Sequence, residues 1–206
     1  MRVVDEFDGG LGWICDERLA RTSHALRTDD GVWLVDPVEP CDTVSQALAA
    51  LGPVRGVVQL LDRHGRDAQT LATRYRVPLH TPYARDTVSQ APFEWVRVAR
   101  SRWWREVALW WPARRVLVCA DALGTLGFFL ARGERIGVRP LLRLTPPRGL
   151  RAYAPDRILV GHGEGVHEGA AAALAVALST SRRRLPAALA HGMRRAVRAR
   201  RATRQP

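Results

Sequence analysis

Short apolar runs separated by Gly- and Asp-rich turns fill the first part of the chain. Across residues 2–38 these runs alternate with turns, a pattern typical of β-hairpins. Apolar residues then recur at helical spacing over 43–51, and a β-branched, mostly apolar run follows at 54–61. We therefore expect a β-rich block whose later strands are followed by helices. The elements expected after the hairpins are strands at 31–37, 54–61 and 77–80 and helices at 43–51 and 67–75.

The second half of the chain shows a similar pattern. Three apolar runs follow Pro92, and a last apolar run and an Ala-rich helix come after a Pro-rich stretch at 139–155. Strands outnumber helices and fall in two blocks, which predicts an α/β fold in which helices cover a pair of sheets, within one domain spanning 1–180. The elements expected here are strands at 95–98, 106–111, 115–120 and 157–160, a loop or short helix at 122–130 and a helix at 168–178.

Positive charge is concentrated at the C-terminal end. All 32 basic residues are Arg, and nine of them lie in 181–206, which contains no acidic residue. Leu185, Leu189, Met193 and Val197 recur every four residues, which predicts one apolar face of a helix. Two interpretations are open for this Arg-rich helix and tail. It docks on the body with a solvated Arg face, or it is an arm that binds nucleic acid or anionic lipid.

Neither a membrane span nor an export signal is expected. No apolar run approaches the ~20 residues needed to cross a bilayer. The first six residues, Met1 to Glu6, lack the charged, apolar and cleavage regions of a signal peptide. These patterns predict a cytoplasmic protein.

Polar residues follow three of the predicted buried strands, where loops on a rigid scaffold commonly carry function. Asp121 follows the strand at 115–120, and His162 lies between two glycines after the strand at 157–160. Small residues flank these positions, so a metal ion or a substrate can come close. The loop after the strand at 54–61 holds Asp62, Arg63, His64, Arg66 and Asp67.

The order of these motifs resembles the metallo-β-lactamase fold superfamily from residue 1 to about residue 180. Members carry H-x-H-x-D-H after an early strand, then a His, an Asp at a strand end, and a late His in a Gly-flanked turn. Asp36 resembles the Asp that ends the family's early strand, Asp121 its bridging Asp and His162 its last His. The resemblance implies a four-layer αββα sandwich with the active site along one edge of the two sheets, here followed by a basic C-terminal helix.

The early motif departs from the family pattern. Asp62 stands for the first His, His64 matches the second, Arg66 stands for the Asp and Asp67 for the last His, and no His occurs near 100–104, where the family has its middle one. A guanidinium does not coordinate metals. At ~5 Å from a divalent ion it would also repel the ion by about 6–7 kcal/mol at an effective dielectric of 20. We therefore expect no complete two-metal site.

One hypothesis keeps a single metal ion. His64, Asp121 and His162 would form a set of two imidazoles and one carboxylate, which suits Fe, Mn or Zn. Asp62 or Asp67 would orient these ligands or act as a base, and a metal-activated water would be the nucleophile. This hypothesis describes a hydrolase-like enzyme with an altered site and an unidentified small-molecule substrate.

The other hypothesis has no metal. Arg66 or Arg63 would fill the vacated space and pair with Asp121, Asp67 or Asp62 through bidentate hydrogen bonds. The protein would then be a catalytically silent member of the fold that binds an anionic ligand in an Arg-containing cleft. A third function, nucleic-acid binding, would reside in the Arg-rich tail.

Overall fold

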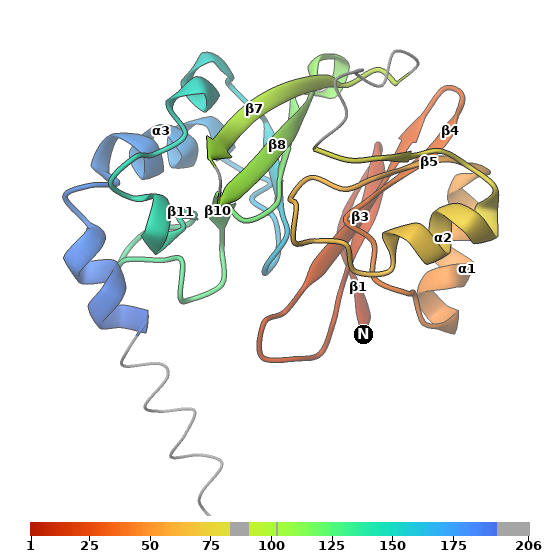
Figure 1. Ribbon diagram of the computed structural model, residues 1–206, viewed down its shortest axis with the longest axis horizontal. Coiled ribbons are helices and arrows are strands. Elements are labelled where there is room, and N and C mark those ends of the chain that lie inside the picture. Colours follow the sequence, from red (N-terminus) through yellow and green to blue (C-terminus); the bar gives the residue numbers. More distant parts are fainter. Residues whose placement is uncertain (83–90, 102, 193–206) are drawn as a thin grey trace, which may run out of the picture.

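The computed structural model describes residues 1–82, 91–101 and 103–192 (Figure 1).

The first of two main sheets has six strands. The strand order is β1-β2-β3-β4-β5-β6, antiparallel as far as β4 and parallel from β4 to β6. Helices connect the parallel strands, because a parallel pair cannot be joined by a tight turn. The elements are β1 (Arg2–Phe7), β2 (Gly10–Ile14), β3 (Thr22–Thr28), β4 (Gly31–Val35), α1 (Asp42–Leu51), β5 (Val54–Val58), α2 (Ala68–Tyr75) and β6 (Leu79–His80).

The second sheet has four strands in the order β12-β9-β8-β7. Its strands β12 and β9 are parallel, and Val160 at the end of β12 pairs with Cys119 at the end of β9. Residues that follow these two strands therefore leave the sheet side by side. The elements are β7 (Glu94–Ser101), β8 (Trp104–Trp111), β9 (Val116–Cys119), β12 (Arg157–Val160), α3 (Ala170–Thr180), the short pair β10 (Leu123–Gly124) and β11 (Gly137–Val138), and 3₁₀ turns at Pro112–Arg114, Pro140–Leu142 and Arg148–Ala152.

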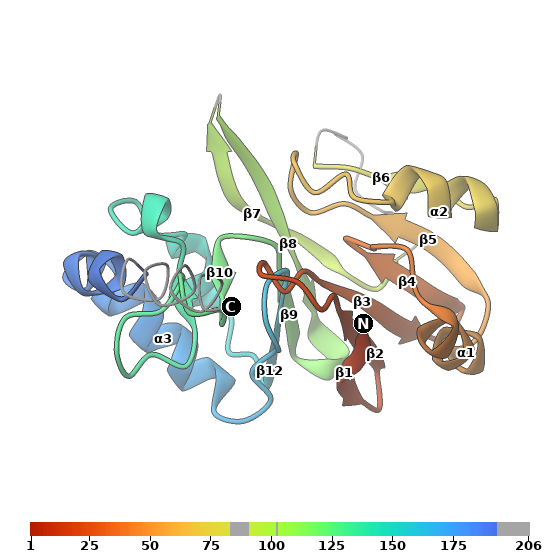
Figure 2. The same ribbon diagram turned by 90° about the horizontal axis from the view of Figure 1, so that it is seen from below.

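Three hydrophobic clusters hold the layers together. One lies between the first sheet and its helices, a second between the two sheets, and a third between the second sheet and α3. Figure 2 shows α1 and α2 on one side of the sheets and α3 on the other. Representative members are Leu48 and Leu34 in the first cluster, Val35 and Val118 in the second, and Leu174 and Ile158 in the third. The predicted α/β class is confirmed, and the layers follow the order helix, sheet, sheet, helix.

The segment 122–130 differs from the prediction of a loop or short helix. It contains β10, which pairs antiparallel with β11, and Leu123 faces Val138 across the pair. A two-residue strand is too short to show an alternating pattern, so nothing in the sequence marks it.

A buried ion pair fixes the chain that follows β10. The carboxylate of Glu134 and the guanidinium of Arg143 are both almost fully buried and lie 2.5 Å apart at their closest atoms. The Glu134 carboxylate also accepts the backbone N–H of Ala131 at 2.7 Å, and Arg143 donates to the carbonyl of Phe129 at 2.7 Å. This network holds the 129–143 segment, which includes β11 and Arg139.

The first part of the basic C-terminal segment contacts the body. Residues 185–192 are helical, and His191 Nδ1 lies 2.9 Å from the carbonyl oxygen of Leu130. Ala188 is fully buried, but Leu189 is 48% exposed. The predicted apolar face is therefore wrong at Leu189, because the helix turns Ala188 and His191 toward the body instead. Met193 and Val197, together with the tail to residue 206, lie outside the described residues.

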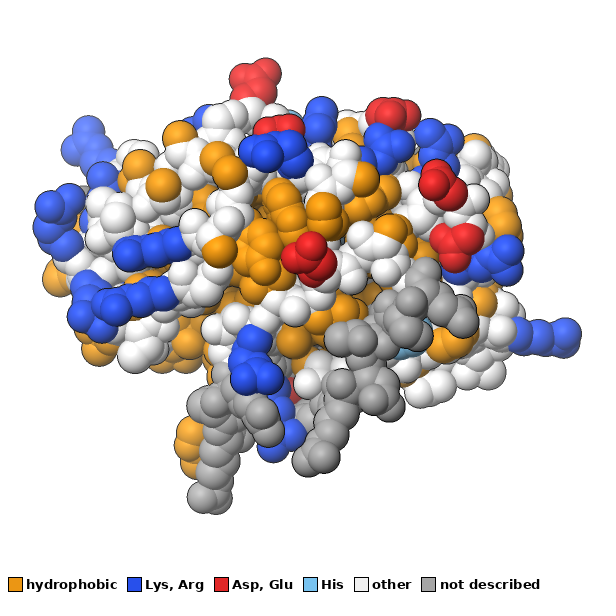
Figure 3. Space-filling view, turned by 90° about the horizontal axis from the view of Figure 1, so that it is seen from above, with side chains coloured by type: hydrophobic (Ala, Val, Ile, Leu, Met, Phe, Trp, Pro, Cys, Tyr) orange, Lys and Arg blue, Asp and Glu red, His pale blue; other side chains and the backbone are white. Residues whose placement is uncertain are grey.

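Arginine side chains are spread over the surface. In the view of Figure 3 they lie at both ends of the molecule, while apolar side chains gather in the middle. Within the described ranges, no helix is both long and apolar enough to span a bilayer.

Candidate metal centre

Three loops bring His64, Asp121 and His162 to one place between the sheets. Asp121 lies two residues after β9 and His162 two residues after β12, so the parallel pairing of these strands makes them neighbours. His64 comes from the first sheet, on the loop between β5 and α2. Gly161 permits this approach, because a Cβ there would lie 2.8 Å from the carbonyl oxygen of Ala120 and 3.1 Å from Cε1 of His64.

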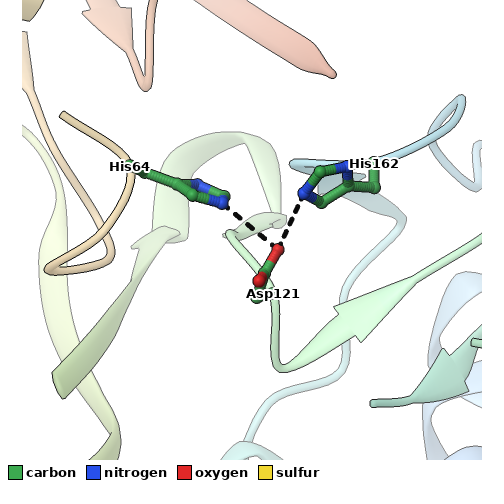
Figure 4. A group of neighbouring side chains, drawn as sticks. All are labelled: His64, Asp121 and His162. Carbon is green, nitrogen blue, oxygen red and sulfur yellow. Dashed lines mark ion pairs between the residues drawn. The ribbon is translucent and has the colours of Figure 1, made fainter. Parts of the chain in front are cut away.

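Both imidazoles point their Nε2 atoms at one oxygen of Asp121 (Figure 4). Asp121 Oδ1 lies 3.2 Å from Nε2 of His64 and 3.0 Å from Nε2 of His162. All three side chains are buried, and one ligand atom from each lies within 4.8 Å of the others. Donors bound to one zinc ion at about 2.0–2.2 Å are roughly 3.3–3.6 Å apart when tetrahedral. The two Nε2–Oδ1 distances, 3.0 and 3.2 Å, are close to this range, so small shifts of the three side chains would let them bind a single ion.

The outer nitrogens of the two rings are already engaged. Nδ1 of His64 lies 2.8 Å from Asp36 Oδ2, and Nδ1 of His162 lies 2.7 Å from the carbonyl oxygen of Leu19. A carbonyl and a carboxylate only accept, so each ring donates from Nδ1 and presents its Nε2 lone pair inward in the neutral form. Histidine ligands of metals are commonly oriented by such partners.

The inward-facing atoms bring electron pairs together at one point. Asp121 Oδ1 is buried and accepts no well-aligned hydrogen bond. Two imidazole lone pairs and a carboxylate oxygen thus converge, an arrangement that requires a cation or a proton. The donor set fits a transition metal of the kind predicted from the sequence.

A proton on His64 can supply the positive charge when no metal is bound. Burial opposes the charged imidazolium, but the carboxylates of Asp36 and Asp121 outweigh it and raise the pKa of His64 to about 9. Burial likewise opposes ionisation of Asp121, yet the imidazoles of His162 and His64 and the Arg139 charge hold its pKa well below the usual range. Asp121 is therefore a carboxylate at neutral pH.

The second oxygen of Asp121 is taken by an arginine. The Arg139 guanidinium pairs with Asp121 Oδ2. Asp121 is left with one oxygen, Oδ1, facing the imidazoles, so it is not free to bridge two ions. Sequence reasoning missed Arg139, because it lies 18 residues away at the start of a Pro-rich stretch with no motif around it.

Glu106 fixes the backbone around Asp121. Its Oε1 accepts the N–H groups of Asp121 at 3.0 Å and Ala122 at 2.9 Å, and its Oε2 accepts the indole N–H of Trp104 at 2.8 Å. Burial raises the pKa of Glu106 to about 7, although the hydrogen bonds from these donors favour its ionised form. Glu106 was also missed, because a single acid in an apolar strand carries no sequence signal of a partner.

Arg66 does not meet the expectation that it pairs with a carboxylate. Its guanidinium donates to the carbonyl oxygens of Thr22 at 2.6 Å, Asp36 at 2.7 Å and Gly161 at 3.0 Å. It therefore ties strand ends of the two sheets together at the place where the family motif has an Asp. The prediction that Arg66 pairs with a carboxylate is therefore wrong, and the guanidinium that pairs with Asp121 is that of Arg139.

The remaining predicted residues lie on the same loop but outside the cluster. Nε of Arg63 is 3.4 Å from Asp62 Oδ1, the one ion pair of the metal-free hypothesis that is present in the described residues. Asp67 Oδ2 accepts the N–H of Glu39 at 2.8 Å. Within the part of the chain that the structure describes, neither Asp62 nor Asp67 belongs to the group of candidate ligands. Their roles as orienting groups or bases stay predictions.

Replacing Asp36 by Asn is expected to weaken metal binding about 10–100-fold, since partners of metal-bound histidines contribute that much to affinity. Asn keeps the shape but removes the charge that holds Nδ1 of His64. Competition with a chromogenic chelator measures the change. Asp5→Asn is the matched control, because Asp5 is also a buried carboxylate, 2.9 Å from Nε2 of His167. Equal affinities of the two variants would contradict the assignment.

Sequence comparisons give no relatives, but structural comparison does. No protein-family model and no curated protein matches the sequence. The DIM-1 metallo-β-lactamase superimposes with a TM-score of 0.60 and 12% identity over 90% of this chain and 96% of that one. For the metallo-β-lactamase from Pontibacter korlensis the values are 0.62 and 13%, over 87% and 98%. The mono-zinc form of the metallo-β-lactamase FIM-1 from Pseudomonas aeruginosa gives 0.59 and 11%, over 89% and 96%.

These likenesses span nearly the whole of the known structures, and they confirm the resemblance predicted from the order of the three site loops. At such low identity the agreement concerns the fold. The chain has the metallo-β-lactamase fold.

Proposed function

We propose that this protein is a metal-dependent hydrolase with a one-metal site formed by His64, Asp121 and His162. The observation that carries the proposal is the convergence of two oriented Nε2 atoms on a buried carboxylate oxygen that has no aligned donor. A neighbour of this fold, FIM-1, has been crystallised in a mono-zinc form. Zn, Mn and Fe all suit two imidazoles and one carboxylate.

Each residue around the proposed site has a definite task. His64 and His162 hold their Nε2 atoms toward the ion, and Asp36 and the carbonyl of Leu19 keep the rings in that orientation. When bound, a divalent ion supplies Lewis acidity, which activates water and polarises the bond to be hydrolysed. Arg139 stabilises Asp121 as a carboxylate, and its position supports one ion rather than two.

Asp62 is the better of the two predicted bases. Its side chain is 15% exposed and lies on the loop that carries His64, two residues before it. The Asp67 carboxylate accepts a backbone N–H of the chain before α1, whereas Asp62 pairs with the half-exposed Arg63, a contact that water can replace. We therefore assign Asp62 the role of proton acceptor from water, and Asp67 the role of holding the loop.

The metal-free alternative is favoured by a different observation. A guanidinium already pairs with Asp121, and a second, Arg66, occupies the position of the family's Asp. In that case the protein binds an anionic ligand without turning it over. Nucleic-acid binding by the Arg-rich tail remains a proposal from charge alone, because residues 193–206 lie outside the described ranges.

Hydrolysis assays on metal-loaded and chelator-treated protein separate the two functions. The panel contains esters, thioesters, lactams and phosphodiesters with chromogenic leaving groups, each assayed with Zn, Mn and Fe(II). We expect turnover of at least one class by loaded protein and none after chelation or in Asp121→Asn. Turnover that survives both treatments, or none in any loaded form, would reject the enzyme.

A further inference from the structure

Two arginines stack on one tryptophan beside the candidate metal centre. The guanidinium carbon of Arg63 lies 5.0 Å from the ring centroid of Trp104, and that of Arg139 lies 5.1 Å from the same centroid. The two charges are therefore no more than about 10 Å apart, although they come from loops far apart in the sequence. Arginines stacked on aromatic rings keep their edge N–H groups available for other partners.

This pair of arginines is connected to the proposed metal ligand in two ways. Arg139 pairs directly with the Asp121 carboxylate. The indole N–H of Trp104 donates to Glu106, which in turn accepts the backbone N–H of Asp121. An ion or molecule held by the two guanidinium groups would thus lie next to the candidate ligands.

Both guanidinium groups are reachable from solvent and retain donors. The side chain of Arg63 is 51% exposed and that of Arg139 is 25% exposed. Arg63 uses one edge on the carbonyl of Trp103 and on Asp62, and Arg139 uses Nη1 on Asp121. A guanidinium has five N–H groups, so each keeps donors for a further acceptor.

The charges around the centre leave a positive surplus once an ion is bound. Among the described side chains that the cited ion pairs and hydrogen bonds join around the centre, three guanidinium groups accompany three carboxylates, and Glu106 adds at most one more negative charge. A divalent ion therefore leaves a surplus of at least one positive charge among these groups. The groups counted are Arg63, Arg66 and Arg139 against Asp36, Asp62 and Asp121.

We propose that Arg63 and Arg139, stacked on Trp104, bind an oxyanion group of the substrate, a phosphate or a carboxylate, beside the metal ion. The inference rests on the proposed function, because it names the substrate class of the same site. Guanidinium groups bind these groups through paired, charge-assisted hydrogen bonds. The substrate is thus an anionic small molecule whose charged group is held at the Trp104 side of the centre.

Binding of inorganic phosphate and of acetate tests this assignment. Both probes are titrated into zinc-loaded and chelator-treated protein, and the indole N–H resonance of Trp104, assigned with Trp104→Phe, reports binding. Arg63→Gln is expected to weaken binding about tenfold or more, as loss of a charge-assisted hydrogen bond does. Arg115→Gln is the matched control, because Arg115 is also 51% exposed and pairs with an Asp, at the far end of β9.

The outcomes distinguish the subsite from the metal centre. Arg63→Gln should still bind zinc as the wild type does, and Arg115→Gln should bind the probes within twofold of it. Binding of phosphate alone assigns a phosphoryl group, and binding of acetate as well assigns a carboxylate. Equal binding by Arg63→Gln and wild type, or no shift of Trp104 with either probe, would overturn the subsite. If the wild type does not bind zinc, the proposed function is rejected instead. Binding of the probes to chelator-treated protein then tests the subsite by itself.

Discussion

Asp121→Asn is expected to lower the affinity for zinc by about 1,000-fold or more, a loss of about 4 kcal/mol of binding free energy. Loss of a partner outside the ligand set already costs about 10–100-fold, and Asp121 is proposed as the only charged ligand. Its Oδ1 is the atom on which both imidazoles converge. Competition with chelators of known affinity measures the change.

The design of this variant limits other effects. The substitution leaves in place the backbone N–H that Glu106 accepts, so the loop after β9 retains its anchor. Arg139 loses an ion pair but is 25% exposed, so water can solvate its charge. Circular dichroism and a thermal melt check that the fold persists. An affinity within tenfold of the wild type would remove Asp121 from the ligand set.

Arg66→Met is expected to lower the free energy of unfolding by about 3–5 kcal/mol, because three hydrogen bonds from a charged donor are lost and each contributes about 1.5–3 kcal/mol before the cost of burying the charge is subtracted. The side chain is partly buried and donates to three carbonyl oxygens from strand ends of both sheets. Methionine has a similar length but no donors, so all three carbonyl oxygens lose a charged donor, although Asp36 keeps the Ser23 hydroxyl and Gly161 keeps the backbone N–H of Thr22. Burial lowers the pKa of Arg66, because desolvation disfavours the charged guanidinium. This cost offsets part of the stabilisation that the three hydrogen bonds provide.

Chemical denaturation in the presence of a chelator measures this loss without a contribution from metal binding. The control is Arg27→Met, because Arg27 is 46% exposed and its pair with Asp8 lies at the surface. Exposed ion pairs contribute about 0–1 kcal/mol, so the control should remain close to the wild type. A loss for Arg66→Met no larger than for the control would mean that Arg66 does not join the two sheets.

The parts of the site that could be predicted from the sequence are those set by local pattern. Asp121 and His162 each follow a short apolar run, and the parallel pairing of β9 and β12 brings the two residues together. His64 follows an apolar run in the other block, and the order of the three loops along the chain carried the resemblance. The pattern of apolar and polar residues alone thus locates the loops that carry the site.

The residues that modify the site depend on contacts that no spacing encodes. Arg139 reaches Asp121 from the chain after β11, and Glu106 reaches it from the inward face of β8. Arg66 was expected to pair with a carboxylate, but its guanidinium donates to three backbone carbonyls that the strand ends of both sheets bring together at that point. A guanidinium accepts either kind of partner, so tertiary packing decides the outcome.

Metal stoichiometry tests the central claim most directly. Purified protein is stripped with a chelator, reloaded with excess zinc, desalted and analysed by mass spectrometry of the elements, with Asp121→Asn treated in parallel. A one-metal site of His64, Asp121 and His162 predicts one zinc ion per chain for the wild type and a large loss for the variant. Two ions per chain would show that Arg66 and Arg139 do not exclude a second metal, and none would show that the three side chains do not form a metal centre.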